Sequence, residues 1–391
     1  MEKGSYRETW VEISLNNLVY NINAFKETIQ PETNLMAVVK ADAYGHGSIE
    51  VAKAAIHAGA NYLAVAFLDE AIILRKAGFS IPILVLGYTS LDTETIEQAI
   101  DHNITLTIYS KEAVERIQEL ATKKKLVCRI HLKIDSGMNR IGVRSTSEAL
   151  QVVSSITSDY LILEGIFTHF ADADVIDSSF VHDQFHHFMD IVSYLQQKGY
   201  DIPVKHCCNT AATIAFPEMH LDMVRVGIGL YGLYPEEHLR NNITLKPVMS
   251  FKTKPILIKD VPTGQTISYG RTYTTTKDSI IATIPVGYAD GLSRSLSNKG
   301  HVTLNGHKAP IVGRVCMDQT MVDLSGINPA DFNEEIILFG DPLDNCISLS
   351  EIAVQMNTIH YEVACLIGKR VPRVYIQNNQ IVATTGLIDS H

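Results

Sequence analysis

The sequence lacks a long apolar segment. No stretch reaches the roughly 18 to 20 uninterrupted apolar residues that a membrane-spanning helix needs. Residues 1–10, read as MEKGSYRETW, also lack the apolar core of a signal peptide. We therefore expect a cytoplasmic protein with no membrane partner.

Cysteine is scarce and dispersed. The 391 residues contain six cysteines, without a CxxC pair or a spacing typical of metal ligands: Cys128, Cys207, Cys208, Cys316, Cys346 and Cys365. Cysteines placed in this way in a large intracellular chain are normally reduced thiols. We predict neither a disulfide nor a metal site.

Positive charge is in deficit. Lysine and arginine total 33 against 43 acidic residues, for a formal net charge of -10. The basic run Lys123 to Lys125 is short and is best explained as a solvated helix end. We therefore expect no nucleic-acid partner. The hydrophobic fraction of 46% is ordinary for a soluble protein, and the length allows two domains.

What the first part of the chain does have is a repeated unit of a short apolar strand followed by a helical pattern. Eight strands are expected, at Leu35–Val39, Tyr62–Ala66, Ile83–Leu86, Thr105–Ile108, Cys128–Ile134, Leu163–Phe167, Val204–His206 and Met223–Val226. A long amphipathic helix is expected at Ser179–Lys198, and Ser14 is a suitable N-cap for an earlier helix. The pattern predicts an α/β fold with a closed (β/α)8 TIM barrel.

After Leu233 the pattern changes. From Lys246 onward, valine, isoleucine and threonine are interrupted by proline and glycine, which predicts short strands and turns. We place a boundary near residue 240, with a barrel at 1–240 and a mostly β C-terminal domain at 241–391. Whether a short strand at Trp10 to Ile13 joins the second domain is left open.

Lys40 ends the first barrel strand, in the segment LMAVVKADAYGHG of Leu35–Gly47. Catalytic side chains of barrels lie at the carboxyl ends of strands, and a lysine partly withdrawn from water is a nucleophile toward aldehydes. A lysine that only extends from a strand end into solvent is the alternative.

Polar residues also follow other strands. Gly227 to Gly232 matches GxGxxG but lacks a clear acidic partner, so it is a weak dinucleotide motif and a better candidate for a single-phosphate loop. Asn209 and Thr210 could cap the next helix, direct donors at a phosphate, or do both. Arg140 suits an anionic oxygen but also suits a surface ion pair, and His169 alone is more often a core residue. In the second domain, Ser268-Tyr269-Gly270, Gly287-Tyr288 and Cys316-Met317-Asp318 indicate loops shaped for a ligand.

Nine motifs together resemble the bacterial alanine racemase family, in the family's order and over nearly the whole chain: AVVKADAYGHG, KIDSGMNRIG, THFADAD, HCCNTAA, VRVGIGLYG, SYGRTY, PVGYADG, GRVCMDQ and HYEV. The resemblance implies an enzyme that uses pyridoxal 5'-phosphate (PLP) to interconvert L- and D-alanine and so supplies D-alanine for peptidoglycan. It also implies a homodimer whose active sites combine both chains.

The resemblance assigns roles to individual residues. Lys40 is expected to bind the cofactor and to act as the base on one of its faces, and Tyr269 of the partner chain as the base on the other. Two bases are needed because inversion removes a proton from one side and returns it to the opposite side. Arg225 is expected at the pyridine nitrogen, and His169 in a hydrogen-bonded chain with Arg225 and Tyr269.

Further residues are implied at the cofactor phosphate and the substrate. The phosphate would be held by Tyr44, Thr210, Gly227, Ile228 and Tyr361, and Asn209 is expected among the residues that bind the cofactor. Arg140 would meet the phenolic oxygen of the cofactor and lie near the substrate carboxylate. The partner chain would add Met317 and Asp318, and Tyr288 and Tyr361 would narrow the entrance. Lys133 matches a position that carries a CO2-derived carbamate in many relatives.

Three residues depart from the family pattern, and three other functions are compatible with parts of the sequence. Thr210, Cys208 and His360 stand where serine, alanine and asparagine are common, which bears on substrate preference more than on the reaction. A non-enzymatic PLP carrier would end after the barrel, and a decarboxylase would favour an acidic residue in place of Arg225. A serine or broad-specificity racemase of the same fold is the remaining alternative.

Overall fold

The protein is described by a computed structural model that covers residues 6–387. The chain forms two compact units. The barrel unit comprises residues 18–43 and 48–245, and the C-terminal unit comprises the described parts of 1–17, 44–47 and 246–391. The short segment 44–47 therefore belongs to the C-terminal unit, although both of its neighbours in the chain belong to the barrel unit.

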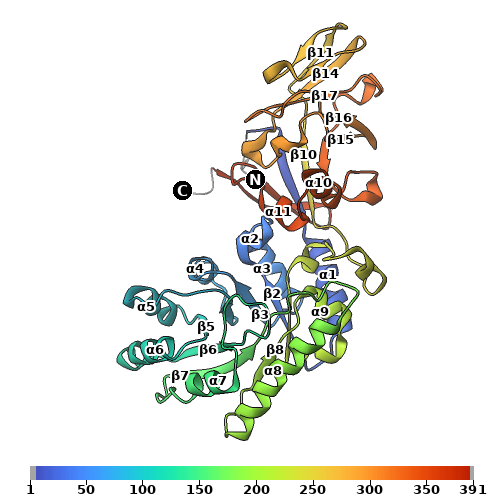
Figure 1. The fold of residues 1–391 in the computed structure, drawn as a ribbon. Coiled ribbons are helices and arrows are strands. Elements are labelled where there is room, and N and C mark those ends of the chain that lie inside the picture. The colour runs from blue at the N-terminus through green and yellow to red at the C-terminus, as the bar shows by residue number, and fades with distance from the viewer. Residues whose placement is uncertain (1–5, 388–391) are drawn as a thin grey trace. The chain divides into compact units, whose positions relative to one another are not determined.

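Eight parallel strands form the barrel (Figure 1). They are β2 (Asn34–Val38), β3 (Tyr62–Val65), β4 (Ile83–Val85), β5 (Thr105–Ile108), β6 (Cys128–Lys133), β7 (Leu161–Phe167), β8 (Val204–His206) and β9 (Met223–Val226). From β2 to β8 each strand pairs with the next one along the chain, and β9 pairs with β2. Backbone bonds from Asp222 N to Lys205 O and from Arg225 N to Cys208 O link β9 to β8 and its following loop. The predicted (β/α)8 barrel is confirmed.

Helices surround these strands (Figure 1). They are α1 (Leu15–Thr28), α3 (Ser48–His57), α4 (Leu68–Lys76), α5 (Thr93–Asp101), α6 (Lys111–Lys124), α7 (Thr146–Val153), α8 (Ser179–Gln197) and α9 (Thr210–Ala215). The start of α1 follows from capping chemistry: Ser14 Oγ accepts from Asn17 N at 3.2 Å, as its position before α1 predicts. The helix expected at 179–198 is confirmed and ends one residue earlier.

The C-terminal unit is mostly β. A seven-stranded sheet has the order β16-β15-β18-β10-β1-β19-β20 and is joined by a three-stranded sheet, β11-β14-β17, and a β12-β13 pair. The strands are β1 (Thr9–Ser14), β10 (Met249–Thr253), β11 (Leu257–Val261), β12 (Thr266–Ile267), β13 (Tyr273–Thr274), β14 (Ser279–Ile284), β15 (His301–Leu304), β16 (His307–Pro310), β17 (Thr320–Asp323), β18 (Ile336–Phe339), β19 (Arg373–Gln377) and β20 (Gln380–Thr385). Two helices complete it, α10 (Leu349–Met356) and α11 (His360–Cys365). Strand β1 lies between β10 and β19, so this N-terminal segment is part of the sheet.

Each unit has its own core. Most residues of the barrel strands are buried; Leu35, Leu63 and Ile130, for example, are 0 to 1% exposed. Burying one such side chain contributes about 1.5–3 kcal/mol, which explains why these short strands read as continuous apolar runs. Within residues 6–387, no helix combines the length and the apolar character needed to cross a bilayer.

Candidate active site

Lys40 opens an unusual turn at the end of β2. Ala41, Asp42 and Ala43 have φ of 53°, 51° and 55°, so α2 (Lys40–Tyr44) is a left-handed turn rather than an ordinary helix. Left-handed backbone costs roughly 1–2 kcal/mol per residue with a side chain. Asp42 Oδ1 accepts from Ser48 N at 2.7 Å and so helps to hold this turn. Tertiary contacts, rather than the local preference of these residues, therefore fix the backbone conformation that follows Lys40.

Glu70 provides the second support of the turn. Its Oε1 accepts from Ala41 N at 2.6 Å, and its Oε2 accepts from Ala66 N at 2.7 Å and Phe67 N at 3.2 Å. One carboxylate therefore ties the residue after Lys40 to the loop between β3 and α4. This role of Glu70 could not be predicted from the sequence, because a single acidic residue early in a helix normally only stabilises the start of that helix.

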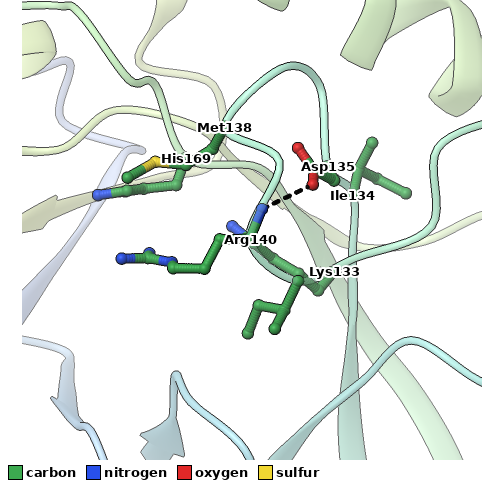
Figure 2. A pocket seen from close by; sticks show the side chains of 7 residues that line it. Lys133, Ile134, Asp135, Met138, Arg140 and His169 are labelled. Atoms are coloured by element: carbon green, nitrogen blue, oxygen red, sulfur yellow. Dashed lines mark hydrogen bonds between the residues drawn. The ribbon is translucent and has the colours of Figure 1, made fainter.

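Asp135 organises the loop that follows β6. Its carboxylate accepts from the backbone N–H groups of Gly137 at 3.1 Å, Asn139 at 2.9 Å and Arg140 at 3.0 Å. Figure 2 shows the bond to Arg140, and in this view the side chains of Arg140 and His169 extend toward the same side of the loop. A small hollow is lined by Lys133, Ile134, Asp135, Met138, Arg140, Ile141 and His169. The structure thus brings three of the expected site residues together: Lys133, Arg140 and His169.

Lys133 is a buried amine in a positive environment. It is 5% exposed, and its Nζ lies 4.4 Å from the centre of the Phe167 ring. Burial, followed by the charges of Arg225 and Arg140, holds the pKa of Lys133 well below its ordinary value. The neutral, nucleophilic form of the amine is therefore favoured.

Arg225 lies on β9 and is 4% exposed. Its guanidinium donates to the carbonyl oxygens of Thr168 at 2.9 Å and Cys207 at 3.0 Å. It also lies 3.0 Å from His206 Nδ1 and 3.2 Å from His169 Nδ1. Burial lowers the pKa of Arg225 to about 10, so the group remains charged at neutral pH. The expected pairing of Arg225 with His169 is present, whereas His206 was not singled out in the sequence.

His169 follows β7 and keeps part of its surface exposed. Loss of water around most of the ring, followed by the positive charge of Arg225, lowers its pKa well below 6.5. The positive charges of Arg140 and Lys40 act in the same direction. The imidazole is therefore neutral.

The Asn209–Thr210 pair caps α9 and fastens the glycine loop. Asn209 Oδ1 accepts from Ala212 N at 2.9 Å, which confirms the capping role. Thr210 Oγ1 accepts from Gly227 N at 3.0 Å and from Gly229 N at 3.5 Å. Gly229 has no room for a side chain, because a Cβ there would lie 2.6 Å from the Phe25 ring. The Thr210 hydroxyl, which is expected to bind the cofactor phosphate, thus also positions the loop from Gly227 to Gly232.

The remaining expected residues lie in the C-terminal unit. Tyr269 is 73% exposed and begins a short turn flanked by Ser268 at φ 63° and Gly270 at φ 71°. Ser268 Oγ donates to the carbonyl of Arg314 at 2.7 Å. This anchored turn presents the Tyr269 phenol at the surface of the unit.

Tyr288, Met317 and Asp318 are held in connected loops. Tyr288 N donates to Cys316 O at 3.0 Å, and Ala289 N donates to Met317 O at 3.1 Å. Asp318 forms an ion pair of 2.7 Å with Arg370. In the same unit, the rings of Tyr44 and Tyr361 have their centres 6.3 Å apart and are inclined at 58°.

The expected site residues therefore fall into two sets. The barrel unit carries Lys40, Lys133, Arg140, His169, Asn209, Thr210, Arg225, Gly227 and Ile228. The C-terminal unit carries Tyr44, Tyr269, Tyr288, Met317, Asp318 and Tyr361. Two buried histidines of the barrel, His131 and His206, were missed. For His131 the available signal was the alternation of polar residues in Arg129-Ile130-His131-Leu132-Lys133, which places every second side chain on one face of β6.

Two family models match the chain. The model described as "Alanine racemase, N-terminal domain" matches residues 13–235, and "Alanine racemase, C-terminal domain" matches residues 248–375. Alanine racemase 2 of Oceanobacillus iheyensis is 54% identical over 389 residues, covering 100% of this chain and 98% of that relative.

Solved structures agree with these matches. The crystal structure of alanine racemase from Bacillus anthracis with bound L-Ala-P has a TM-score of 0.94 and 40% identity, with 100% of both chains covered. That of alanine racemase from Bartonella henselae with covalently bound pyridoxal phosphate has a TM-score of 0.84 and 28% identity, covering 94% of this chain and 99% of that one. The chain therefore belongs to the alanine racemase family.

Proposed function

We propose that this protein is an alanine racemase that interconverts L- and D-alanine with PLP as cofactor. The observation that carries the proposal is the buried Arg225 guanidinium, which can only donate hydrogen bonds and which lies beside neutral His169 in the same unit as Lys40. An acidic residue in this position would suit a decarboxylase. When bound, PLP supplies a ring that withdraws electrons from the α-carbon of an amino acid attached to it.

The residues of the barrel unit fit this cofactor. Lys40 offers an amine for the aldehyde carbon, and Arg225 offers a donor for the pyridine nitrogen, which then stays unprotonated. Thr210 Oγ1 accepts the N–H of Gly227, so its own proton is free to be donated to a phosphate oxygen. Asn209 and the backbone of Ile228 complete the phosphate-binding loop. In the C-terminal unit, Tyr44 and Tyr361 would add phenolic donors to the same phosphate.

Racemisation needs a proton acceptor on each side of the α-carbon. Lys40 would remove or return the proton on one face, and Tyr269 would do so on the other. A tyrosine accepts a proton readily at neutral pH only where cationic neighbours stabilise its phenolate, and the Tyr269 phenol is 73% exposed. We infer that the barrel of a second copy of this chain covers Tyr269, so that the working form is a homodimer with shared sites. Tyr288, Met317 and Asp318 would reach the substrate from the same copy as Tyr269.

Lys133 would be carbamylated in the working enzyme. Its neutral amine can add to the carbon of CO2, forming a C–N bond and releasing one proton to water. The product is an anion, and the nearby charges of Arg140 and Arg225, which disfavour the ammonium, would stabilise it. The carbamate would hold Arg140 in place for the substrate carboxylate and for the phenolic oxygen of the cofactor.

The reaction would supply D-alanine for peptidoglycan in the cytoplasm. The choice between alanine and serine depends on the space left by the loops of Tyr288 and Met317. Loss of optical rotation, measured separately with L-alanine and L-serine, decides it: faster loss with alanine supports the proposal, and faster loss with serine contradicts the assigned substrate.

Subunit complementation tests the shared site. Lys40→Ala and Tyr269→Phe should each be inactive as purified holoproteins. Subunit exchange in an equal mixture should form hybrid dimers with one intact site each, so about a quarter of the wild-type specific activity should return. Labelled subunits would show by native mass spectrometry that hybrids form. Hybrids without activity would contradict the proposal.

A further inference from the structure

A polar chain passes through the interior of the barrel, where apolar side chains normally fill the space. It starts at Arg225 on β9 and continues through His206 on β8 and His131 on β6 to Glu164 on β7. Arg225 lies 3.0 Å from His206 Nδ1, His206 Nε2 lies 2.9 Å from His131 Nδ1, and His131 Nε2 lies 3.2 Å from Glu164 Oε2. His206 and His131 are both 0% exposed.

The hydrogen bonds of this chain can run in one direction only. An arginine side chain has no acceptor, so His206 Nδ1 must accept from Arg225. His206 then carries its proton on Nε2 and donates it to His131 Nδ1. By the same step, His131 carries its proton on Nε2 and donates it to the Glu164 carboxylate. Both rings are neutral in this arrangement, and burial lowers the pKa of each histidine, which agrees with it.

The backbone is shaped to make the chain possible. The pairing of β6 with β7 contains an irregularity: Ile130 is opposite Leu163, but His131 is opposite Gly165, so Glu164 has no partner in the register. A Cβ on Gly165 would lie 2.5 Å from the His131 ring. The bulge and the glycine therefore give His131 its space and turn Glu164 toward it.

The two ends of the chain differ in their surroundings. The Phe167 ring stacks on His206 with centres 4.8 Å apart and planes inclined at 5°, which holds the imidazole beside buried Arg225. At the other end the Glu164 side chain is 16% exposed and forms an ion pair of 3.3 Å with Arg129, whose side chain is 40% exposed. The negative charge of Glu164 is thus partly hydrated. Because each histidine donates at Nε2 and accepts at Nδ1, the acceptor at Glu164 leaves Nδ1 of His206 as the acceptor that faces Arg225.

We propose that His131 and Glu164 are positioning residues that fix the tautomer of His206 and thereby hold Arg225 in the orientation needed at the cofactor. This inference rests on the proposed function, because Arg225 is assumed to face the pyridine nitrogen. Without the chain, His206 could carry its proton on Nδ1, where it would point at the guanidinium and displace it.

The test compares four variants of the holoenzyme. Glu164→Leu removes the terminal acceptor, and His131→Phe removes the relay while keeping a ring. Glu164→Gln keeps an acceptor oxygen without the charge. Arg129→Gln is the matched control, because it removes the ion pair of Glu164 but leaves the bond from His131 intact. Circular dichroism and melting temperature verify that each variant folds.

The decisive measurement is the 15N NMR spectrum of histidine-labelled protein, which reports the tautomer of His206 whether or not the enzyme turns over. Wild type, Glu164→Gln and Arg129→Gln should carry the proton on Nε2. Glu164→Leu and His131→Phe should show a new population with the proton on Nδ1. In these two variants kcat should fall at least about tenfold, the size of effect seen when metal-binding histidines lose their outer partners, while the KM for alanine changes less than about twofold.

The outcomes separate the inference from the function on which it rests. If His206 keeps its Nε2 proton in both Glu164→Leu and His131→Phe, the positioning role is overturned, even if activity falls. If wild type does not racemise alanine but the tautomer changes as expected, the proposed function fails and the direction of the chain stands. Restored kcat in Glu164→Gln relative to Glu164→Leu supports an acceptor rather than a charge as the requirement.

Discussion

His169 accepts a hydrogen bond from Arg225, with 3.2 Å between the guanidinium nitrogen and Nδ1. Since arginine cannot accept, the proton of neutral His169 must reside on Nε2. The same reasoning applies to His206 on the other side of the guanidinium. Arg225 thus stands between two neutral imidazoles, and among residues 6–387 no carboxylate accepts a hydrogen bond from its guanidinium.

Buried neutral histidines predict a loss of stability in mild acid. His131 and His206 have a lowered pKa because they are buried, so they are neutral in the folded state and protonated in the unfolded state once the pH falls below about 6.5. The unfolded state then binds more protons, and the free energy of unfolding falls by about 1.4 kcal/mol per pH unit for each such histidine. Melting temperatures from pH 7.5 to 5.5 should decrease accordingly.

A variant isolates this effect. His131→Phe has one buried histidine fewer, so its stability should fall less steeply with decreasing pH. The control His57→Gln changes an exposed histidine and should keep the wild-type slope. Equal slopes in all three proteins would contradict the assignment.

Strand and helix positions in the barrel were predictable from local patterns. The strands at Thr105–Ile108, Val204–His206 and Met223–Val226 have the expected bounds, and the strand leading to Lys40 ends at Val38 instead of Val39. Fully buried strands read as apolar runs because both faces are covered. The predicted strand ends also indicated which polar residues could lie in one site, because active sites of barrels lie at the carboxyl ends of the strands.

Features that depend on distant contacts were not predictable. Asp42 tolerates left-handed backbone, but the alanines on either side of it do not favour it; Glu70, 29 residues after Ala41, supports the turn. The bulge at Glu164 appears only when β6 and β7 are paired. The segment 44–47 joins the C-terminal unit through contacts such as the bond from Arg373 Nε to Gly45 O at 3.1 Å. Such long-range pairings cannot be inferred from the sequence of a single strand or turn.

The carbamate proposed on Lys133 can be tested directly. Native mass spectrometry at neutral pH should show each subunit heavier by one CO2, and acidification should remove it. Activity should fall in CO2-depleted buffer and return with bicarbonate, because the amine form leaves Arg140 without its anion. Lys133→Met should be insensitive to bicarbonate, whereas Lys205→Met, at a partly exposed lysine, should respond like wild type. An unmodified Lys133 in active protein would refute the carbamate.

Glu70 should stabilise the turn at Lys40. In Glu70→Gln the side chain keeps its size but replaces one acceptor oxygen with a donor group, which would face Ala41 N or Ala66 N. Leaving such a bond unmade costs about 1–3 kcal/mol, so urea denaturation should show a loss of that order. Lys40 should also react more slowly with added PLP, followed by absorbance.

Glu115→Gln is the control for Glu70→Gln. Glu115 forms an exposed pair with Lys111, and loss of such a pair changes stability by about 0.5 kcal/mol or less. If Glu70→Gln is as stable as this control, the carboxylate does not support the turn.

Gly287 should be required for the shape of the substrate loops. Its φ of -146° suits any residue, but an added Cβ would lie 2.3 Å from the carbonyl oxygens of both Cys316 and Met317. Gly287→Ala must therefore push the Met317 loop away from Tyr288. Because a displacement of about 1 Å at a site can cost on the order of 100-fold in rate, kcat/KM for alanine should fall by at least tenfold.

The matched control is Gly326→Ala in the same unit, where an added Cβ has no atom within 4 Å. It should keep wild-type kinetics and melting temperature. The kinetics of Gly287→Ala also test the role of Met317. If Met317 contacts the substrate carboxylate, KM should rise by a larger factor than kcat falls. A Gly287→Ala enzyme with unchanged KM and reduced kcat would place Met317 outside the carboxylate site, because a displaced carboxylate contact weakens binding of the substrate before it affects the proton transfers.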